Sequence, residues 1–256
     1  MTLSFYFSLL ILFGGVLAGA ALVLWGLKTF GSTARLLLAF SGSFLFSTTI
    51  FVWLPEVFSS DHGHASEWTG IEIGAWVMVG FLLQYLLDFA TKGLEHGHVH
   101  MPSDHSLGAH HAQLPLGALL GLVLHSLLEG LPLAALDTHS RTAFVSAIAL
   151  HNLPVSMVLV LWFTSLRLSL KKIALGVVLF ALATPVGALL GQWIAPNEGG
   201  VHTVFIALVA GIFLHVSTTI LFENQKDHRF NAEKLAVVMG GAALAWAVAL
   251  SGSIPH

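Results

Sequence analysis

The sequence predicts an all-α polytopic membrane protein, and two observations lead to that fold class. Hydrophobic residues make up 56% of the 256 residues and charged residues only 9%, whereas a soluble domain carries about 25% charged residues. The mean hydropathy is +0.85, and the apolar residues fall in runs of about 20, the length that crosses a bilayer. So little charge cannot cover a surface exposed to water, so we expect a multi-pass protein of a cell membrane.

Eight apolar runs are long enough to form transmembrane helices. They cover residues 4–27, 36–58, 72–91, 114–136, 143–166, 173–195, 201–222 and 235–254. Their connections are short except for 92–113, so we expect residues 1–256 to form a single membrane domain. The first run is long enough to span and no basic segment precedes it, so we expect no cleavable signal peptide.

Small residues and prolines recur inside these runs. Glycines four residues apart let helices approach closely, so we expect a packing role for the pairs Gly15/Gly19, Gly117/Gly121 and Gly187/Gly191. Each proline inside a span removes a backbone hydrogen bond and can kink its helix; these prolines are Pro132, Pro154 and Pro185.

The basic residues predict the orientation of these spans. Lys and Arg favour the cytoplasmic side of short membrane loops. If the eight runs alternate in direction, nine of the ten Lys and Arg residues fall on one side, and Arg141 alone falls on the other. We therefore expect the first side to be cytoplasmic, both termini to lie outside, and the loop 92–113 to face the cytoplasm.

Composition also excludes several classes of function. The formal net charge is -3, and no basic face exists that would bind a nucleic acid. Cysteine is absent, so a disulfide framework, a thiolate metal site and a cysteine nucleophile are excluded. The phosphate-binding motif GxxxxGK[ST] is missing too, so this chain does not drive transport by its own ATP hydrolysis.

Ionisable side chains interrupt two of the predicted spans. His125 and Glu129 are four residues apart and therefore share one helix face. A carboxylate in lipid persists when it is paired, protonated or bound to a cation, and imidazole nitrogen with carboxylate oxygen suits a divalent metal. On the next span, His151 can supply a third ligand and Asn152 a weak oxygen. The pattern predicts a metal site near the bilayer midplane between the fourth and fifth spans; a His–Glu hydrogen bond that only holds two helices together is the open alternative.

These stretches resemble a known family of membrane proteins. HSLLEG at 125–130 and HNLP at 151–154 resemble the paired motifs of the ZIP (Zrt/Irt-like) metal transporters. LPE at 54–56, the His-rich loop after the third span and AGIFL at 210–214 agree with that family. The resemblance extends over the whole chain. It implies a ZIP-like bundle that carries zinc, iron or manganese toward the cytoplasm and is not an enzyme. It also implies that a helix bundle holding the site slides against a scaffold.

The resemblance implies roles for the residues of this chain that lie at matching positions. It implies His125 and Glu129 as ligands from the fourth span and His151 as the ligand from the fifth, with Asn152 at a polar position of the motif. His215, inside the seventh span, is a candidate fourth ligand or gate; a histidine bonded to a neighbouring carbonyl is the alternative. The expected transported substrate is Zn2+, with Fe2+, Mn2+, Co2+ and Cd2+ as alternatives.

Four positions depart from the family pattern. Ser126 takes the place of an Asn that many members carry, and Val155 takes the place of a Glu. Thr184 takes the place of an acidic residue of the family, and Val52 the place of a His found in some members. Most carboxylates that would bridge a second metal are therefore missing. We expect a bacterial-type member with a degenerate second metal site, which binds one metal ion. A relative that senses or binds metal without transporting it is the alternative that these losses leave open.

Other polar residues have weaker interpretations. Gln84 and Asp88 share a face near the cytoplasmic end of the third span; they line an exit path, or Asp88 caps its helix or pairs with Lys92. The loop 92–113 is either a weak metal-binding region or a polar linker, and its histidines are His96, His98, His100, His105, His110 and His111. The acidic and His-bearing loop 61–67 either gathers cations outside or is merely solvated.

Two further classes of function remain as alternatives. An intramembrane metalloprotease would need a motif such as HExxH, in which Glu follows His directly, and no predicted span contains it. A proton-coupled transporter without a metal is the other. The expected partners are a divalent metal ion, the lipid bilayer and a second copy of the chain in a homodimer, with no nucleic acid. The compact loops and the absence of a transit peptide indicate a bacterial inner membrane.

Overall fold

The protein is a bundle of long helices. The computed structural model describes residues 4–25, 31–59, 68–91, 115–136, 138–195, 200–223 and 232–252, and every element within them is helical. Eight helices are long and apolar enough to cross a membrane, which confirms the predicted fold class and the number of spans. The loops 61–67 and 92–113 lie outside the described residues, so what we expect of them stays a prediction.

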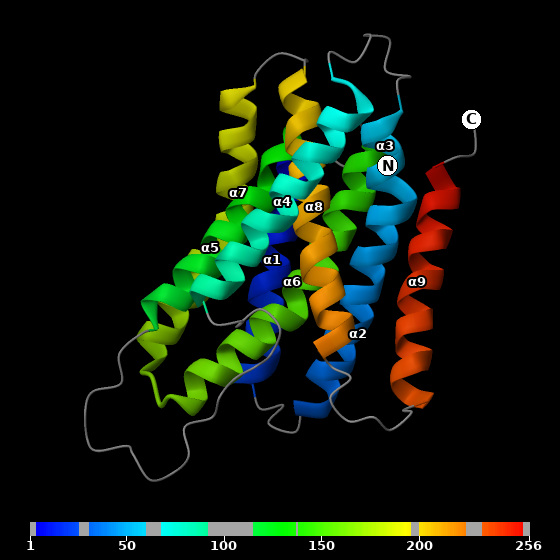
Figure 1. Cartoon of the computed structure of the whole chain (residues 1–256). Coiled ribbons are helices and arrows are strands. Elements are labelled where there is room, and N and C mark those ends of the chain that lie inside the picture. The colour runs from blue at the N-terminus through cyan, green and yellow to red at the C-terminus, as the bar shows by residue number, and fades with distance from the viewer. Residues whose placement is uncertain are drawn as a thin grey trace.

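The helices follow the predicted runs along the chain. They are α1 (Phe5–Leu24), α2 (Gly31–Thr48) with the π-helix η1 (Thr49–Trp53) and α3 (Leu54–Phe58), α4 (Gly70–Thr91), α5 (Leu116–Gly130) with the 3₁₀-helix η3 (Leu131–Ala134), α6 (Thr138–Ser165), α7 (Leu170–Ile194), α8 (Gly200–Glu223) and α9 (Ala232–Gly252). Figure 1 shows α1 beginning and α9 ending at the same end of the bundle, as eight alternating spans require. We call this the outer end, following the orientation that the basic residues predict.

Local interactions set several helix ends. At the start of α4, Glu72 Oε2 accepts from the Thr69 backbone N–H at 2.7 Å, and Thr69 Oγ1 accepts from the Glu72 N–H at 3.3 Å. This reciprocal arrangement is a capping box, which satisfies amide groups that have no partner inside the helix. After α6, Arg167 has a φ of 54°, and this left-handed residue ends the helix and turns the chain into α7.

The three prolines expected inside spans have different effects. Pro132 lies in η3, directly after α5, so the fourth span changes from α-helix to 3₁₀-helix at its outer end. Pro154 and Pro185 lie inside α6 and α7, which continue through them. The 3₁₀ turn after Glu129 therefore ends the helix that carries the first two candidate ligands.

The helices form two groups of four. The closest packing within the first group joins α1 with α6 and α7, and α5 with α7. The closest packing within the second joins α4 with α8, and α2 with α9 and α8. We call α1, α5 with η3, α6 and α7 the site-bearing set. We call α2 with η1 and α3, α4, α8 and α9 the flanking set. The two sets meet mainly where α2 lies against α6 and α4 lies against α5.

Glycines bring helices of the same set into close backbone contact. A Cβ atom at Gly187 or Gly191 of α7 would overlap the carbonyl oxygen of Leu127 or Leu131. Gly80 of α4 and Gly211 of α8 approach backbone of each other's helix in the same way. The expectation that Gly187 and Gly191 serve packing is therefore confirmed, as it is for Gly19 of α1, which meets the Leu153 carbonyl of α6. It is wrong for Gly117, which has open space beside it.

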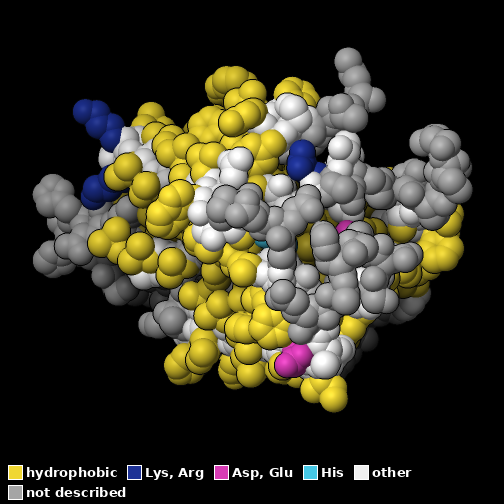
Figure 2. All heavy atoms as spheres, turned by 90° about the horizontal axis from the view of Figure 1, so that it is seen from above, with side chains coloured by type: hydrophobic (Ala, Val, Ile, Leu, Met, Phe, Trp, Pro, Cys, Tyr) yellow, Lys and Arg dark blue, Asp and Glu magenta, His cyan; other side chains and the backbone are white. Residues whose placement is uncertain are grey.

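Large apolar side chains cover much of the outside of the bundle. Exposed examples include Ile71, Phe89, Trp193 and Met239, and Figure 2 shows apolar side chains over most of the described surface seen from the outer end. Such a surface is stable in contact with lipid tails rather than water. Buried polar side chains lie inside the bundle as well, and Gln84, His125, Glu129 and His151 are among them.

Candidate metal centre

His125 and Glu129 lie one helical turn apart on the buried face of α5. His125 is 1% exposed and Glu129 is 0% exposed. His125 Nε2 lies 2.9 Å from Glu129 Oε1. Glu129 Oε2 has no hydrogen-bond partner among the described residues. A carboxylate shut away from water in this way needs positive charge nearby, because burial of an uncompensated charge is strongly unfavourable.

The position of α5 follows from its packing on α7. The Leu127 carbonyl, between the two candidate ligands, lies against Gly187, and Gly130, next to Glu129, lies against the Thr184 carbonyl. Because neither glycine has a side chain, α5 approaches α7 at backbone contact on one face. Its other face then presents His125 and Glu129 toward α4 and α6.

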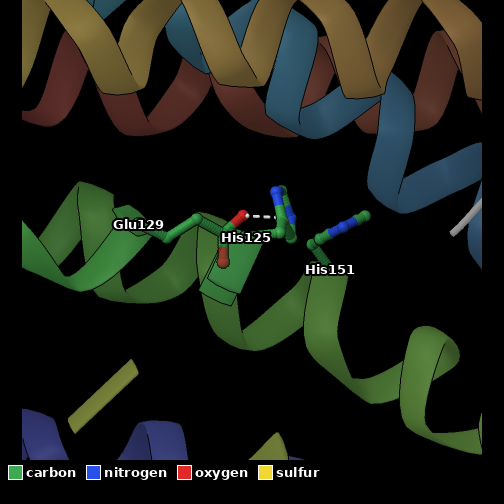
Figure 3. A group of neighbouring side chains, drawn as sticks. All are labelled: His125, Glu129 and His151. Atoms are coloured by element: carbon green, nitrogen blue, oxygen red, sulfur yellow. Dashed lines mark ion pairs between the residues drawn. The ribbon is translucent and has the colours of Figure 1, made fainter. Parts of the chain in front are cut away.

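His151 of α6 completes a group of three. It is 1% exposed, and its ring centroid is 6.3 Å from that of His125. One ligand atom from each of His125, Glu129 and His151 can be chosen so that all three lie within 4.8 Å of one another. Figure 3 shows the Glu129 carboxylate turned toward the His125 ring, with His151 beside it on the neighbouring helix.

This group fits a divalent cation in chemistry and in spacing. Two atoms bound to one tetrahedral zinc ion lie roughly 3.3 Å apart, given bond lengths of about 2.0–2.1 Å. The observed separations lie close enough to that value for small side-chain movements to bring all three ligands onto one ion. Two imidazoles and one carboxylate leave the fourth position of a tetrahedral ion open to water or another exchangeable ligand.

The positions that flank this group carry neutral side chains. Ser126 and Asn152 are 0% and 2% exposed, and neither Ser126 Oγ nor Asn152 Nδ2 has a hydrogen-bond partner among the described residues. Val155, one turn after His151, is buried and apolar, and Thr184 is buried on α7. The flanking side chains are therefore neutral, and Glu129 supplies the only carboxylate of the described cluster. Asn152 as a weak ligand stays a prediction.

His215 lies outside this group of three, on α8. Its Nδ1 is 3.7 Å from Asp88 Oδ2 of α4, and its ring packs edge-on against Phe81 and Tyr85, with centroids 5.0 Å and 5.9 Å away. Asp88 thus contacts a histidine of its own set, an interaction that we did not expect from the sequence. The role of His215 as a fourth ligand or gate stays a prediction.

One residue that sequence reasoning undervalued touches the centre directly. Gln84 of α4 is 0% exposed, and His125 Nδ1–H donates to Gln84 Oε1 at 2.9 Å. The signal available in the sequence was an uncharged amide inside an apolar span, because a buried amide needs a partner. The partner could not be identified from the sequence, because it lies on a different helix.

Comparison with known proteins identifies the class to which this fold and site belong. The family model described as ZIP Zinc transporter matches residues 103–249, more than half of the chain and all of α5 to α8. The chain belongs to the ZIP family of zinc transporters, which confirms the resemblance seen in the motifs of α5 and α6.

Several curated relatives carry the same kind of name. Zinc transporter ZIP9 of Micropogonias undulatus is 30% identical over 169 residues, which is 61% of this chain and 53% of the relative. Zinc transporter ZIP9 of Xenopus tropicalis is 30% identical over 172 residues, 62% of this chain and 55% of the relative. Zinc transporter ZIP9-A of Xenopus laevis is 29% identical over 170 residues. The chain spans about half the length of the curated relatives it matches.

Proposed function

We propose that this protein is a divalent metal carrier that moves zinc toward the cytoplasm through the centre formed by His125, Glu129 and His151. The observation that carries the proposal is this fully buried pairing of two imidazoles with one carboxylate between α5 and α6. Membership of a family of zinc transporters supports it. Iron, manganese, cobalt and cadmium use overlapping ligands, so they are expected as competing substrates.

Each residue has a defined task in this proposal. A hydrated cation loses water as it enters, and Glu129 supplies the negative charge that offsets this loss. Neutral His125 and His151 supply nitrogen ligands, which bind zinc more strongly than they bind the harder magnesium and calcium ions. Three protein ligands with one exchangeable position hold the ion without making its release prohibitively slow.

An aromatic cluster formed by Trp53, Phe144 and Phe213 extends from the centre toward the outer end. The rings of Trp53 and Phe144 lie with centroids 4.9 Å apart, and those of Phe144 and Phe213 lie 5.7 Å apart. Phe144 is two helical turns nearer the outer end of α6 than His151, a rise of about 10 Å. Because Trp53 and Phe213 belong to the flanking set and Phe144 to the site-bearing set, movement between the sets would separate this aromatic cluster and open an outer path.

Uptake into proteoliposomes that contain a zinc-sensitive dye tests the proposal. We expect wild-type protein to carry zinc inward, and Glu129→Ala to reduce the initial rate to that of empty vesicles. Glu233→Ala is the matched control, because Glu233 is an exposed glutamate at the start of α9. Absence of wild-type uptake for zinc, iron, manganese and cobalt, in protein that is folded and correctly inserted, would contradict carrier function.

A metal sensor or binder that does not transport is the second candidate function. The specific observation in its favour is the neutral environment of Ser126, Asn152, Val155 and Thr184, which offers no second carboxylate beside Glu129. Binding of zinc without uptake would favour it. Enzyme activity is not proposed, because the family consists of transporters. We further propose a bacterial inner-membrane location and a homodimer, which cell fractionation and mass determination in detergent would test.

A further inference from the structure

Gln84 reaches the candidate metal centre from the opposite side of the boundary between the two sets. It lies on α4 of the flanking set, is fully buried, and its Oε1 accepts the hydrogen bond from His125 Nδ1 at 2.9 Å. His125 lies on α5 of the site-bearing set. This hydrogen bond therefore connects a candidate ligand to the set that does not carry the centre.

The hydrogen bond determines which nitrogen of His125 can bind a metal. An amide oxygen only accepts hydrogen bonds, so Nδ1 must carry the proton. In a neutral imidazole the lone pair then belongs to Nε2, the atom 2.9 Å from Glu129 Oε1. Gln84 thus holds the His125 ring in the tautomer and orientation that present the free nitrogen to Glu129.

The Gln84 amide is not needed to hold α4 in its place in the bundle. Gly80 of α4 lies against the backbone of α8, and Gly211 of α8 lies against the backbone of α4. These two reciprocal contacts fix α4 within the flanking set. A buried amide is also costly wherever its hydrogen-bonding groups are not used, so an apolar side chain would serve simple packing against α5 better.

We propose that Gln84 is a positioning residue that prepares His125 for metal binding only while the two sets hold the relative position seen here. The proposal rests on the proposed function. Sliding of the site-bearing set would carry His125 away from Gln84 and break the hydrogen bond. His125 would then lose the group that fixes its tautomer, so the affinity for the metal differs between the two ends of the transport cycle.

Zinc affinity of three variants of the full chain tests this role. Gln84→Met and Gln84→Leu remove the acceptor oxygen at similar volume, whereas Gln84→Glu keeps an acceptor at the same reach. Loss of such an outer partner weakens metal binding by about 10–100-fold in metalloproteins, and we expect that range for Gln84→Met and Gln84→Leu. Gln84→Glu is expected to bind zinc at least as tightly as wild type. Leu82→Met, on the same helix with 50% of Leu82 exposed, is the matched control and is expected to leave the affinity unchanged.

Affinity is measured by chelator competition on purified protein. The binding that remains in Glu129→Ala is subtracted, because it reports zinc held without the Glu129 carboxylate, at the centre or elsewhere. Variants are compared only if they are monodisperse, and the use of two variants without the acceptor oxygen guards against misfolding of one of them.

Affinities of Gln84→Met and Gln84→Leu within about twofold of wild type would overturn the role of Gln84 and leave the centre intact. Equal losses in Gln84→Glu and Gln84→Met would also overturn it, because the acceptor would not be what matters. Wild-type binding no greater than that of Glu129→Ala would instead overturn the proposed function, and the role of Gln84 with it.

Discussion

Glu129 is the residue whose presence most needs a physical explanation. A carboxylate that is 0% exposed inside an apolar bundle costs several kcal/mol unless charge or hydrogen bonds compensate it. The described surroundings offer His125 within 2.9 Å and His151 close by, both of which are neutral ligands when they bind a metal. A divalent cation bound by the three residues would supply the missing positive charge, which supports the proposed metal centre.

Zinc binding at the centre should depend on pH in a defined direction. His125 and His151 must be deprotonated to bind the ion, and an unperturbed imidazole has a pKa of about 6.5. Protons therefore compete with zinc increasingly as the pH falls, and we expect the affinity to fall by about tenfold or more between about pH 7 and about pH 5. Titration of the Glu129→Ala-corrected affinity over this range measures the effect, and a constant affinity would exclude histidine ligation.

Val155 offers a test of the missing second carboxylate. It lies one turn after His151 and is 5% exposed, so Val155→Glu places a carboxylate beside the centre. A hydrogen bond or contact to a charged group contributes about 1.5–3 kcal/mol, so we expect zinc to bind about tenfold more tightly or better and to be released more slowly. Chelator competition and single-turnover efflux measure the two effects, with Thr164→Glu, exposed near the C-terminal end of α6, as the control. Weaker binding in Val155→Glu would show that this position does not face the ion.

At the level of the elements, the pairing of α5 with α7 positions the two α5 ligands. The backbone of α5 lies against Gly187 and Gly191, so the rotation of α5 about its axis is fixed by contact with a neighbour that carries no ligand. Pro132 then ends the α-helix directly after Glu129 by starting η3. The candidate ligands are thus held by rigid elements, and in the proposed function a bound ion would join α5 to α6.

Gly187→Ala should destabilise this pairing strongly. The added Cβ would overlap the Leu127 carbonyl oxygen, and overpacking against backbone costs about 1–3 kcal/mol or more. Thermal unfolding in detergent should therefore occur at a lower temperature, and zinc affinity should fall with it. Gly117→Ala is the matched control on α5, where nothing lies within 4 Å; it should be neutral or slightly stabilising, because alanine favours a helix over glycine. Similar unfolding temperatures for both variants would contradict the close contact.

The sequence predicted the spans and the three central residues because both have local signals. Apolar runs of sufficient length identify helices, and His125 and Glu129 share a face at the spacing of one turn. The partner of Gln84, the pairing of His215 with Asp88 and the open space beside Gly117 depend on how helices far apart in the chain pack. No local pattern encodes those contacts, which is why the packing role expected of Gly117 was wrong and the contact between Gln84 and His125 was missed.

At the scale of the whole molecule, the two sets are joined by side-chain pairs as well as by the packing of α2 against α6. Within the sets, glycines bring backbones into direct contact, as at Gly80, Gly187 and Gly211. Across the boundary, the contacts include the side-chain pairs of Trp53 with Phe144 and of Gln84 with His125. Side-chain contacts can be exchanged for others when rigid groups move past each other, whereas interlocked backbones hold together. The arrangement therefore supports movement of the site-bearing set as a unit.

Zinc uptake by a protein whose two sets can be reversibly joined is the most direct test of this account. The chain contains no cysteine, so a pair can be introduced at Glu56 of α3 and Ser140 of α6, where Glu56 Oε2 accepts from Ser140 Oγ at 3.3 Å across the boundary. A control pair at Ser43 and Val238, where Ser43 Oγ donates to the Val238 carbonyl at 2.6 Å, joins two helices of the flanking set. We expect a short, reducible thiol cross-linker to stop zinc uptake by Glu56→Cys/Ser140→Cys while zinc binding to this variant is retained. Reduction of the cross-link should restore uptake. The cross-linked control pair should continue to take up zinc. Undiminished uptake by the fully cross-linked boundary pair would contradict a carrier that works by movement between the two sets.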